Sequence, residues 1–302
     1  MNSVNDRKVI LITGASTGIG LALARLLRNS SKFRVIATAR YNSLQRFFNA
    51  NLFENEYFHI RPLDVTSTSE QQLLIEEIVE KWGRLDFLVN NAGISYRAVI
   101  EDIDQDSELK QFLTNYWAPL SLTRLALPLM RQQQEGHIIN ISSVGGMMAM
   151  PTMGLYSASK FALEGASEAL WYEVRPWNIH VTLVEPGFIN SEAFTHVQWT
   201  PKAMSAVSKT TTPYHMHYHY MSRFIGKMMG WTLSSSENIA KKIVKVMEQP
   251  NPPLRLMVTP DAWFFGMIRR FVPRRWYHGF LYRSLPHIKE WERHVQKQLI
   301  EN

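Results

Sequence analysis

Tyr156 and Lys160 are the residues whose types and spacing best suit proton-transfer chemistry. They lie four positions apart in residues 155–164, a stretch without Gly or Pro that favours a helix. On a helix, this spacing brings the phenol and the ammonium to one face. The positive charge would then lower the tyrosine pKa from its free value of about 10 towards the working pH of a general acid–base. Taken alone, the pair fits a half-exposed tyrosine beside a solvated lysine on a surface helix better, and the other motifs of the chain reverse this interpretation.

A glycine-rich turn near the N-terminus indicates a phosphate-binding site. Residues 8–13 are apolar and β-branched and predict a buried strand, residues 14–20 read Gly-Ala-Ser-Thr-Gly-Ile-Gly, and residues 21–27 begin an apolar helix. Glycines let the backbone approach a pyrophosphate, and the N-terminus of the helix offers free N–H groups. The alternative is a tight strand-to-helix loop, but the position directly after the first strand favours a nucleotide site.

The end of the second predicted strand, residues 33–39, indicates which dinucleotide the protein prefers. Dinucleotide folds place this end beside the adenosine ribose, where a carboxylate suits a 2′-hydroxyl and an arginine suits a 2′-phosphate. Here Arg40 follows the strand and no acidic residue does. We therefore expect NADP(H) rather than NAD(H), with an ordinary surface arginine as the alternative.

The order of the remaining elements predicts an α/β fold with a doubly wound parallel sheet. Further strands are expected at residues 57–63, 85–89, 137–141, 179–184 and 254–259, with helices at 66–82, 102–130 and 236–247 between them. Pro119 and Pro128 are expected to kink or divide the helix over 102–130. Ligands in such sheets bind beyond the carboxyl ends of the strands. The residues that follow strands are therefore expected to share one crevice: Gly14, Arg40, Asp64, Asn90, Ser143 and Pro186.

Length and composition indicate one large domain with an extension. Of the 302 residues, 45% are hydrophobic, and we assign residues 1–260 to a single domain, with a substrate loop at 190–230, and residues 261–302 to a helical tail. There is no cysteine, which excludes disulfides and thiolate metal sites and fits a reducing compartment. The polar first seven residues indicate no signal peptide, and no apolar run is long enough to predict a spanning helix. We therefore expect a cytoplasmic protein.

The C-terminal third is basic, with 16 Lys and Arg against 7 Asp and Glu in residues 191–302. Residues 263–277 mix aromatic side chains with paired arginines, which fits either a tail packed over the substrate pocket or a dimer partner, or a peripheral membrane contact. We expect the packed tail and keep the membrane contact as the alternative. Nucleic-acid binding is not expected, because no recognised reader module accompanies the charge.

Two further clusters have alternative interpretations. Met147, Met148, Met150 and Met153 fit either an adaptable lipophilic substrate wall or ordinary core filling. His215, His217 and His219 alternate, as metal ligands on a strand would, yet no carboxylate lies near them in the sequence. We therefore expect no metal site.

Together these motifs resemble the short-chain dehydrogenase/reductase family over residues 8–259. The matching segments are Thr-Gly-Ala-Ser-Thr-Gly-Ile-Gly at 13–20, Asn-Asn-Ala-Gly at 90–93, Asn115, Ser143, Tyr-Ser-Ala-Ser-Lys at 156–160 and Pro-Gly at 186–187. Within the family the chain resembles the 17β-hydroxysteroid dehydrogenase and retinol dehydrogenase branch, which acts on bulky lipophilic alcohols and carbonyls. The supporting stretches are 33–40, 143–146, 159–165 and the extended end from 253–255.

The resemblance implies a role for each matching residue. Tyr156 would exchange a proton with the substrate oxygen, Lys160 would lower its pKa and hold the nicotinamide ribose, Ser143 would orient the substrate, and Asn115 would position a relay water. Asp64 would lie near the adenine. Ser191, where the family usually has Thr, would contact the nicotinamide amide. The expected cofactor site comprises Gly14, Ser16, Thr17, Gly18, Ile19, Gly20, Arg40, Asp64, Val65, Asn91, Ala92, Gly93, Tyr156, Lys160, Pro186, Gly187, Ile189 and Ser191.

The resulting hypothesis is an oxidoreductase that transfers a hydride between NADP(H) and a lipophilic alcohol or carbonyl. The resemblance also implies a homodimer or homotetramer formed through helices that include the Tyr156 helix. The alternative is a cofactor-sensing protein that kept the fold without useful turnover. The full set of Asn115, Ser143, Tyr156 and Lys160 argues against a pure sensor, which needs no proton donor.

Overall fold

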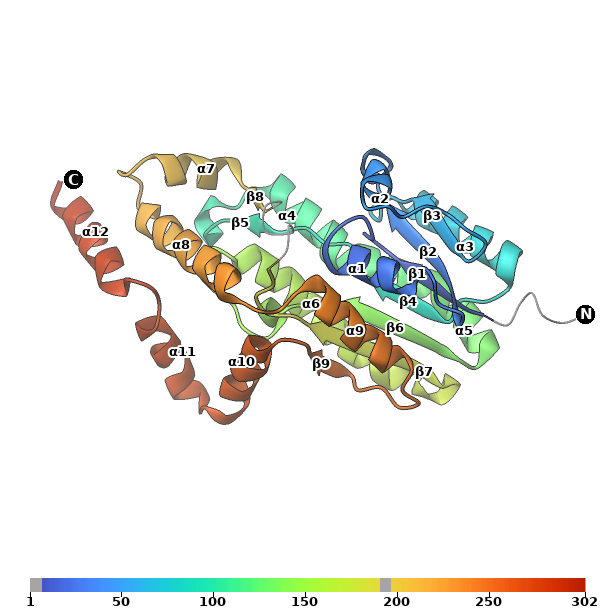
Figure 1. Cartoon of the computed structure of the whole chain (residues 1–302). Helices are drawn as coiled ribbons and strands as arrows, with labels where there is room; N and C mark the ends of the chain where they lie inside the picture. The colour runs from blue at the N-terminus through green and yellow to red at the C-terminus, as the bar shows by residue number, and fades with distance from the viewer. Residues whose placement is uncertain (1–6, 191–196, 302) are drawn as a thin grey trace, which may run out of the picture.

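The computed structural model describes residues 7–190 and 197–301 and shows a central parallel sheet with helices on both faces (Figure 1). Within these residues the sheet has seven strands in the order β3-β2-β1-β4-β6-β7-β9, and every neighbouring pair is parallel. The doubly wound sheet predicted from the sequence is confirmed. The strands are β1 (Lys8–Ile12), β2 (Phe33–Ala39), β3 (Phe58–Pro62), β4 (Phe87–Asn90), β6 (Gly136–Ile141), β7 (Ile179–Glu185) and β9 (Arg255–Met257).

The sheet is buried on both faces, and this explains why its strands are almost continuous apolar runs. Side chains alternate along β1: Ile10 and Ile12 pack in the core cluster that contains α1 and α9, whereas Val9 and Leu11 pack with α3 and α5 on the other face. The helices are α1 (Gly18–Leu27), α2 (Gln45–Asn49), α3 (Thr68–Trp82), α4 (Gln105–Phe112), α5 (Ala118–Gln133), α6 (Gly154–Val174), α7 (Pro201–Ser208), α8 (His215–Trp231), α9 (Ser236–Met247), α10 (Pro260–Phe271), α11 (Arg274–Arg283) and α12 (Ile288–Glu301).

The strand order reverses between β1 and β4, which are neighbours although they are not consecutive in the chain. At such a switch point the loops that leave the two strands diverge to opposite faces and open a crevice. The loop after β1 is the glycine turn, and the loop after β4 is the segment 91–93. The sheet therefore positions these two motifs side by side.

The long helix expected over residues 102–130 is divided differently from the prediction. Pro119 lies in the first turn of α5, where its missing N–H has no intrahelical partner to lose. Pro128 lies inside α5 and does not divide it. The break comes earlier, where α4 ends and a π-helical turn, Leu113–Trp117, precedes α5.

The segment expected as a lid or substrate loop with short helices, residues 190–230, contains one short helix and one long helix. A short strand β8 (Gln198–Trp199) pairs with β5 (Tyr96–Arg97), and α7 and α8 follow. Tyr218, Met221 and Ile225 form the buried face of α8, at the i, i+3, i+7 spacing of a helix. The surrounding His, Met and Tyr residues obscure this period. His215, His217 and His219 thus lie on a helix rather than a strand, and no group of three metal-ligating side chains occurs in the described part of the chain.

The chain ends in a helical extension made of α10, α11 and α12, which runs to one end of the molecule beside α8 (Figure 1). α12 packs on α8, and Trp291 of α12 is buried there. None of the helices that the structure describes has the length and apolarity needed to cross a bilayer.

Candidate active site

Helix α6 brings Tyr156 and Lys160 to one face, as their spacing predicts. The Lys160 Nζ atom lies 5.8 Å from the centroid of the Tyr156 ring. Lys160 is buried, and its ammonium donates a hydrogen bond of 2.7 Å to the carbonyl oxygen of Ile141, at the end of β6. A buried ammonium requires such a partner, because desolvation without one costs several kcal/mol. The lysine therefore fixes α6 against the carboxyl end of β6.

Ser143 lies beside the tyrosine ring in the turn that follows β6. Its Oγ accepts a hydrogen bond of 3.0 Å from the Gly145 N–H. A Cβ placed on Gly145 would be 3.0 Å from the Tyr156 ring and 3.4 Å from Ser143 Oγ. The bare backbone of Gly145 thus lets the ring pack close to the hydroxyl, and both groups face the same space.

Asn115 reaches the same site from the π-helical turn between α4 and α5. Its amide is fixed on both sides: Oδ1 accepts from the Ile94 N–H at 2.9 Å, and Nδ2 donates to the Ile94 carbonyl at 2.9 Å and to Ser159 Oγ at 3.1 Å. A Cβ on Gly93 would lie 3.4 Å from Asn115 Oδ1 and 3.9 Å from Lys160 Nζ. The asparagine and the lysine are thus neighbours across the end of β4. Single π-turns occur frequently at functional sites.

The glycine turn and the segment 91–93 are held together tightly. Gly14 has φ +61°, and a Cβ there would lie 2.7 Å from Ala92 Cα, so a side chain fits neither its conformation nor its space. The Asn91 amide donates to the carbonyls of Thr13 and Gly14, each at 2.9 Å. Asn91 therefore shapes the turn. Thr17 at the N-cap of α1 makes no side-chain capping hydrogen bond, so its side chain does not occupy the first N–H groups of α1, which are the groups that a phosphate would bind.

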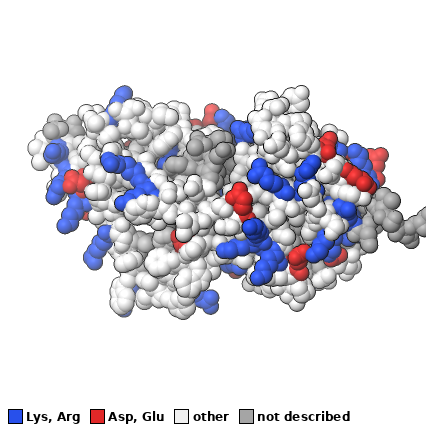
Figure 2. All heavy atoms as spheres, in the orientation of Figure 1, with Lys and Arg blue, Asp and Glu red and all other residues white. Residues whose placement is uncertain are grey.

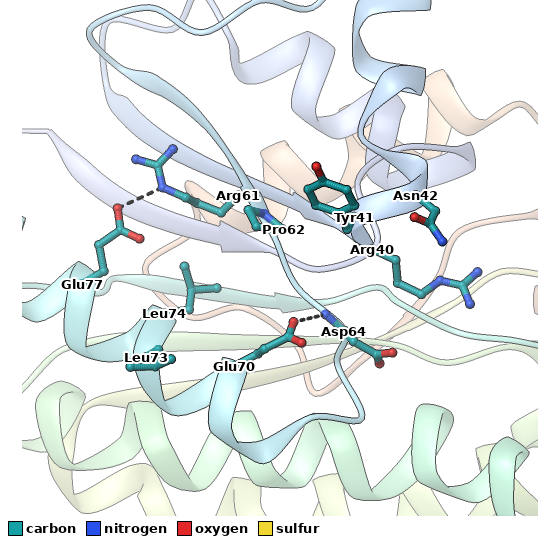
Figure 3. Close-up of a pocket in the computed structure, with 10 residues that line it drawn as sticks. All are labelled: Arg40, Tyr41, Asn42, Arg61, Pro62, Asp64, Glu70, Leu73, Leu74 and Glu77. Atoms are coloured by element: carbon teal, nitrogen blue, oxygen red, sulfur yellow. Dashed lines mark hydrogen bonds and ion pairs between the residues drawn. The ribbon is translucent and has the colours of Figure 1, made fainter.

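The predicted adenosine end of the site is a cavity of about 700 Å³ at the carboxyl ends of β2 and β3 (Figure 3). Arg40 and the Asp64 carboxylate extend to the same side of it, whereas Arg61 points to Glu77 on the other side. Arg40 is exposed and forms no ion pair within the described residues. Asp64 is fixed by hydrogen bonds from Thr66, at 2.9 Å to its N–H and 2.7 Å to its hydroxyl.

Most of the other predicted cofactor residues lie around these two turns. Ser16 and Val65 are buried, Thr17, Gly18 and Ile19 begin α1, and Gly20 is packed against Asn91. Pro186 follows β7, and its carbonyl accepts the Val144 N–H at 2.7 Å, next to Ser143. The side chain of Ile189 packs against the core cluster of α1 and α9. Ser191 lies outside the described residues.

Burial sets the pKa values of the central pair. Desolvation raises the pKa of Tyr156, and a hydrogen bond with the Ser143 hydroxyl opposes the rise. The sequence-based expectation had the opposite direction, because it considered the lysine charge and not the burial. Desolvation also lowers the pKa of Lys160 to about 8, and the Glu164 carboxylate opposes that shift.

A buried ionic cluster beneath the pair was not found from the sequence. Glu164 lies one turn after Lys160, is buried, and accepts a hydrogen bond of 2.5 Å from Ser142 Oγ. Arg255 of β9 bonds to Glu164 and, at 2.8 Å, to the fully buried Glu185 of β7. Desolvation and the charge of Glu164 raise the pKa of Glu185 to about 7. Glu164 follows Tyr156 and Lys160 at the i, i+4, i+8 spacing of one helical face, and this spacing could have indicated that it lies near the pair.

An apolar cluster rich in methionine adjoins the N-terminal end of α6, the helix that carries Tyr156. Met150 and Met153, from the turn before α6, pack against a cluster formed by Phe188, Met221, Ile225 and Trp291. Phe265, Leu285 and Ile288 of the extension pack against the same cluster. Two of the four methionines thus pack on this cluster, whereas Met148 is buried outside it, and this packing fits both a substrate wall and core filling. Thioether side chains adapt to irregular apolar ligands.

The chain belongs to the short-chain dehydrogenase family, whose family model matches residues 8–201. It is 35% identical over 256 residues to oxidoreductase BOA17 of Botryotinia fuckeliana, covering 84% of this chain and 90% of that protein. It is 34% identical over 253 residues to a 3-ketodihydrosphingosine reductase of Bacteroides thetaiotaomicron, covering 84% and 88%.

Solved structures show the same architecture. A short-chain dehydrogenase from Streptomyces avermitilis matches with a TM-score of 0.71 at 28% identity, over 96% of this chain and 99% of that one. The structure of ElxO with NADP bound matches with a TM-score of 0.67 at 26% identity, over 85% and 99%. The family and the fold establish the protein as an oxidoreductase of the short-chain dehydrogenase type.

Replacing Tyr156 by Phe removes the proton donor and leaves the ring that packs on Gly145. We expect turnover to fall about 100- to 10,000-fold, the usual contribution of a general acid–base, while NADPH binding stays nearly unchanged. Steady-state kinetics and cofactor fluorescence titration measure the two quantities. Tyr172→Phe, on an exposed position of the same helix, is the matched control. Retained turnover in Tyr156→Phe would contradict the proton-transfer role.

The Lys160 pKa of about 8 predicts a limb in the pH profile of kcat/KM for reduction. The ammonium favours the phenolate that forms when Tyr156 gives up its proton, so the rate should fall as pH rises through about 8. Because Glu164 raises the Lys160 pKa, Glu164→Gln should move the limb to lower pH. Glu168→Gln, at a half-exposed position one turn further along α6, should leave it in place. An unchanged limb in Glu164→Gln would refute the coupling.

Proposed function

We propose that this protein is an NADP(H)-dependent oxidoreductase that interconverts a lipophilic alcohol and its carbonyl compound. The observation that carries the proposal is the convergence of Tyr156, Ser143, Lys160 and Asn115 on one space beside the glycine turn. Three elements supply these groups: α6, the turn after β6 and the π-helical turn before α5. A structural role alone gives no reason to bury an ammonium within 6 Å of a phenol.

Each of the four side chains has a distinct role in the proposed reaction. Tyr156 gives its phenolic proton to the substrate oxygen in reduction and takes it back in oxidation. Ser143 donates a hydrogen bond to that oxygen and so orients the reacting carbon. Lys160 supplies the positive charge that stabilises the phenolate, and Asn115 helps to return the proton through a bound water. When the nicotinamide cofactor is bound, it supplies or accepts the hydride.

Arg40 supports a preference for NADP(H). It is an exposed arginine at the end of β2 without an acidic partner in the described structure, and Arg61 is already engaged by Glu54 and Glu77 at 2.9 Å each. Arg40 therefore remains available for a 2′-phosphate. The related ElxO structure contains NADP. The residues around the cavity thus fit the cofactor predicted from the sequence.

The methionine-rich cluster at the N-terminal end of α6 supports a lipophilic substrate. Its members come from the turn before α6, from α8 and from the extension, so the segments outside the nucleotide-binding half provide the apolar surface. The relative from Bacteroides thetaiotaomicron is named as a reductase of 3-ketodihydrosphingosine, a long-chain lipid ketone. We propose a substrate of this lipophilic class, which also includes the steroid- and retinoid-like compounds indicated by the resemblance.

We propose a homo-oligomer for the same chain. Phe161 and Tyr172 of α6 and Trp117 before α5 are exposed large side chains on the helices expected to form the contact. Their exposure in the single chain fits an interface of this kind.

Arg40→Gln tests the cofactor preference. Loss of a charge-assisted hydrogen bond of about 1.5–3 kcal/mol should weaken NADPH binding about 10- to 150-fold and leave NADH binding unchanged. Arg46→Gln, at an exposed position on α2, should change neither. Equal NADH and NADPH affinity in the unmodified protein would contradict the assignment.

A series of aliphatic ketones of increasing length tests the substrate class, with the absorbance of NADPH as the readout. Burial of each added methylene is worth up to about 0.8 kcal/mol, so kcat/KM should rise about twofold to fourfold per carbon until the apolar cluster is covered. Met150→Gln should flatten this dependence, and Met204→Gln, on the exposed side of α7, should not. NADPH binding without oxidation by any ketone or lipid carbonyl would favour the cofactor sensor.

A further inference from the structure

The outward side of α10 and α11 exposes an unusual concentration of large aromatic residues. Trp263, Phe264, Phe271, Trp276 and Phe280 are each more than half exposed, between 54% and 67%. Scattered exposed apolar residues are normal on a protein surface, but a contiguous group marks an interaction site. These five lie within 18 consecutive positions, on two adjoining helices.

The same two helices carry arginines without acidic partners. Residues 260–283 contain five arginines and one acidic residue. Arg269, Arg270 and Arg275 lie 5.0, 5.8 and 4.8 Å from the rings of Phe161, Phe271 and Trp276. None of the ion pairs in the described part of the chain includes these three arginines or Arg283. Figure 2 shows basic side chains bordering an uncharged area over this part of the molecule.

A hollow of about 410 Å³ on α11 combines both kinds of side chain. It is lined by Arg275, Trp276, Gly279, Phe280, Arg283 and Ser284. The space at Gly279 is open, because a Cβ there would meet nothing within 4 Å. Two guanidiniums beside two aromatic rings suit an anionic phosphate joined to an apolar chain, the chemistry of an acidic phospholipid.

The inward side of the extension faces the proposed substrate region. Phe265, Leu285, Ile288 and Trp291 belong to the methionine-rich cluster at the N-terminal end of α6. Ala262 is buried, whereas its neighbours Trp263 and Phe264 point outward. The extension therefore separates the apolar cluster on one side from the aromatic and basic surface on the other.

We propose that α10 and α11 dock on the surface of an anionic lipid bilayer. The exposed aromatic rings would lie at the level of the headgroups, and the arginines would contact lipid phosphates. The positive charge matches an anionic membrane and is opposed by a single acidic residue in this segment. Docking also places the apolar cluster beside the bilayer. That second consequence, entry of a lipophilic substrate from the membrane, rests on the proposed function, whereas the docking itself does not.

Flotation with vesicles tests the docking independently of turnover. The full-length protein should float with phosphatidylcholine vesicles that contain phosphatidylserine, much less with phosphatidylcholine alone, and less as salt is raised. Arg275→Gln with Arg283→Gln should weaken partitioning about fivefold per arginine removed. Trp276→Ala with Phe280→Ala should also weaken it. Both variants should keep the NADPH affinity of the unmodified protein, which confirms that they fold.

The matched control is Lys227→Gln with Trp231→Ala, an exposed cation–aromatic pair of α8 with 4.3 Å between the ammonium and the ring centroid. It should float like the unmodified protein. Failure of the unmodified protein to float with anionic vesicles would overturn the proposal, as would equal flotation of all variants. A change of oligomeric state in the α11 variants, measured by light scattering without lipid, would instead identify the surface as a contact between copies of this chain and would also overturn it.

Discussion

The arrangement of the site depends on the burial of one positive charge, the Lys160 ammonium. Desolvation of that charge is compensated by the Ile141 carbonyl at 2.7 Å and by the nearby Glu164 carboxylate. Burial of Glu164 in turn requires the Ser142 hydroxyl and Arg255. A series of charge and hydrogen-bond pairings thus connects helix α6 to β6, to β7 through Glu185, and to the edge strand β9. The geometry around Tyr156 is a consequence of where these charges can be buried together.

The glycine turn and the apolar segments that follow β7 meet at the same edge of the sheet. Short loops after β1 and β4 converge at the switch point of the sheet and are locked by the Asn91 amide. The longer segments after β7 lie outside the sheet, apart from β9. They fold over the same edge and contribute apolar side chains. One edge of the sheet therefore combines a polar region around the glycine turn with an apolar region around the methionine-rich cluster.

The sequence predicted the sheet, the glycine turn and the Tyr156–Lys160 pair, because each depends on local patterns. Parallel strands buried on both faces are continuous apolar runs, and a spacing of four residues defines a helical face whatever surrounds it. The π-turn that carries Asn115 could not be predicted, since one extra residue in a helical turn leaves no periodic signal. Short helices were expected around α8, but its length was not, because its buried stripe consists of Tyr, Met and Ile among other aromatic and sulfur-containing residues. The direction of the Tyr156 pKa shift was also wrong, because burial is a property of the fold and not of the spacing.

The position of Arg255 has a consequence for synthesis of the protein. Glu164 and Glu185 leave the ribosome 91 and 70 residues before the arginine that pairs with them. A nascent chain that already contains β1 to β7 therefore has two carboxylates at the centre of its core without their cation. Until β9 emerges, the edge of β7 is unpaired, and burial of the two carboxylates carries an uncompensated desolvation cost. An exposed strand edge is a template for association with other chains. Addition of β9 thus pairs the free edge of β7 and, in the same step, brings the Arg255 guanidinium to the buried carboxylates of Glu164 and Glu185.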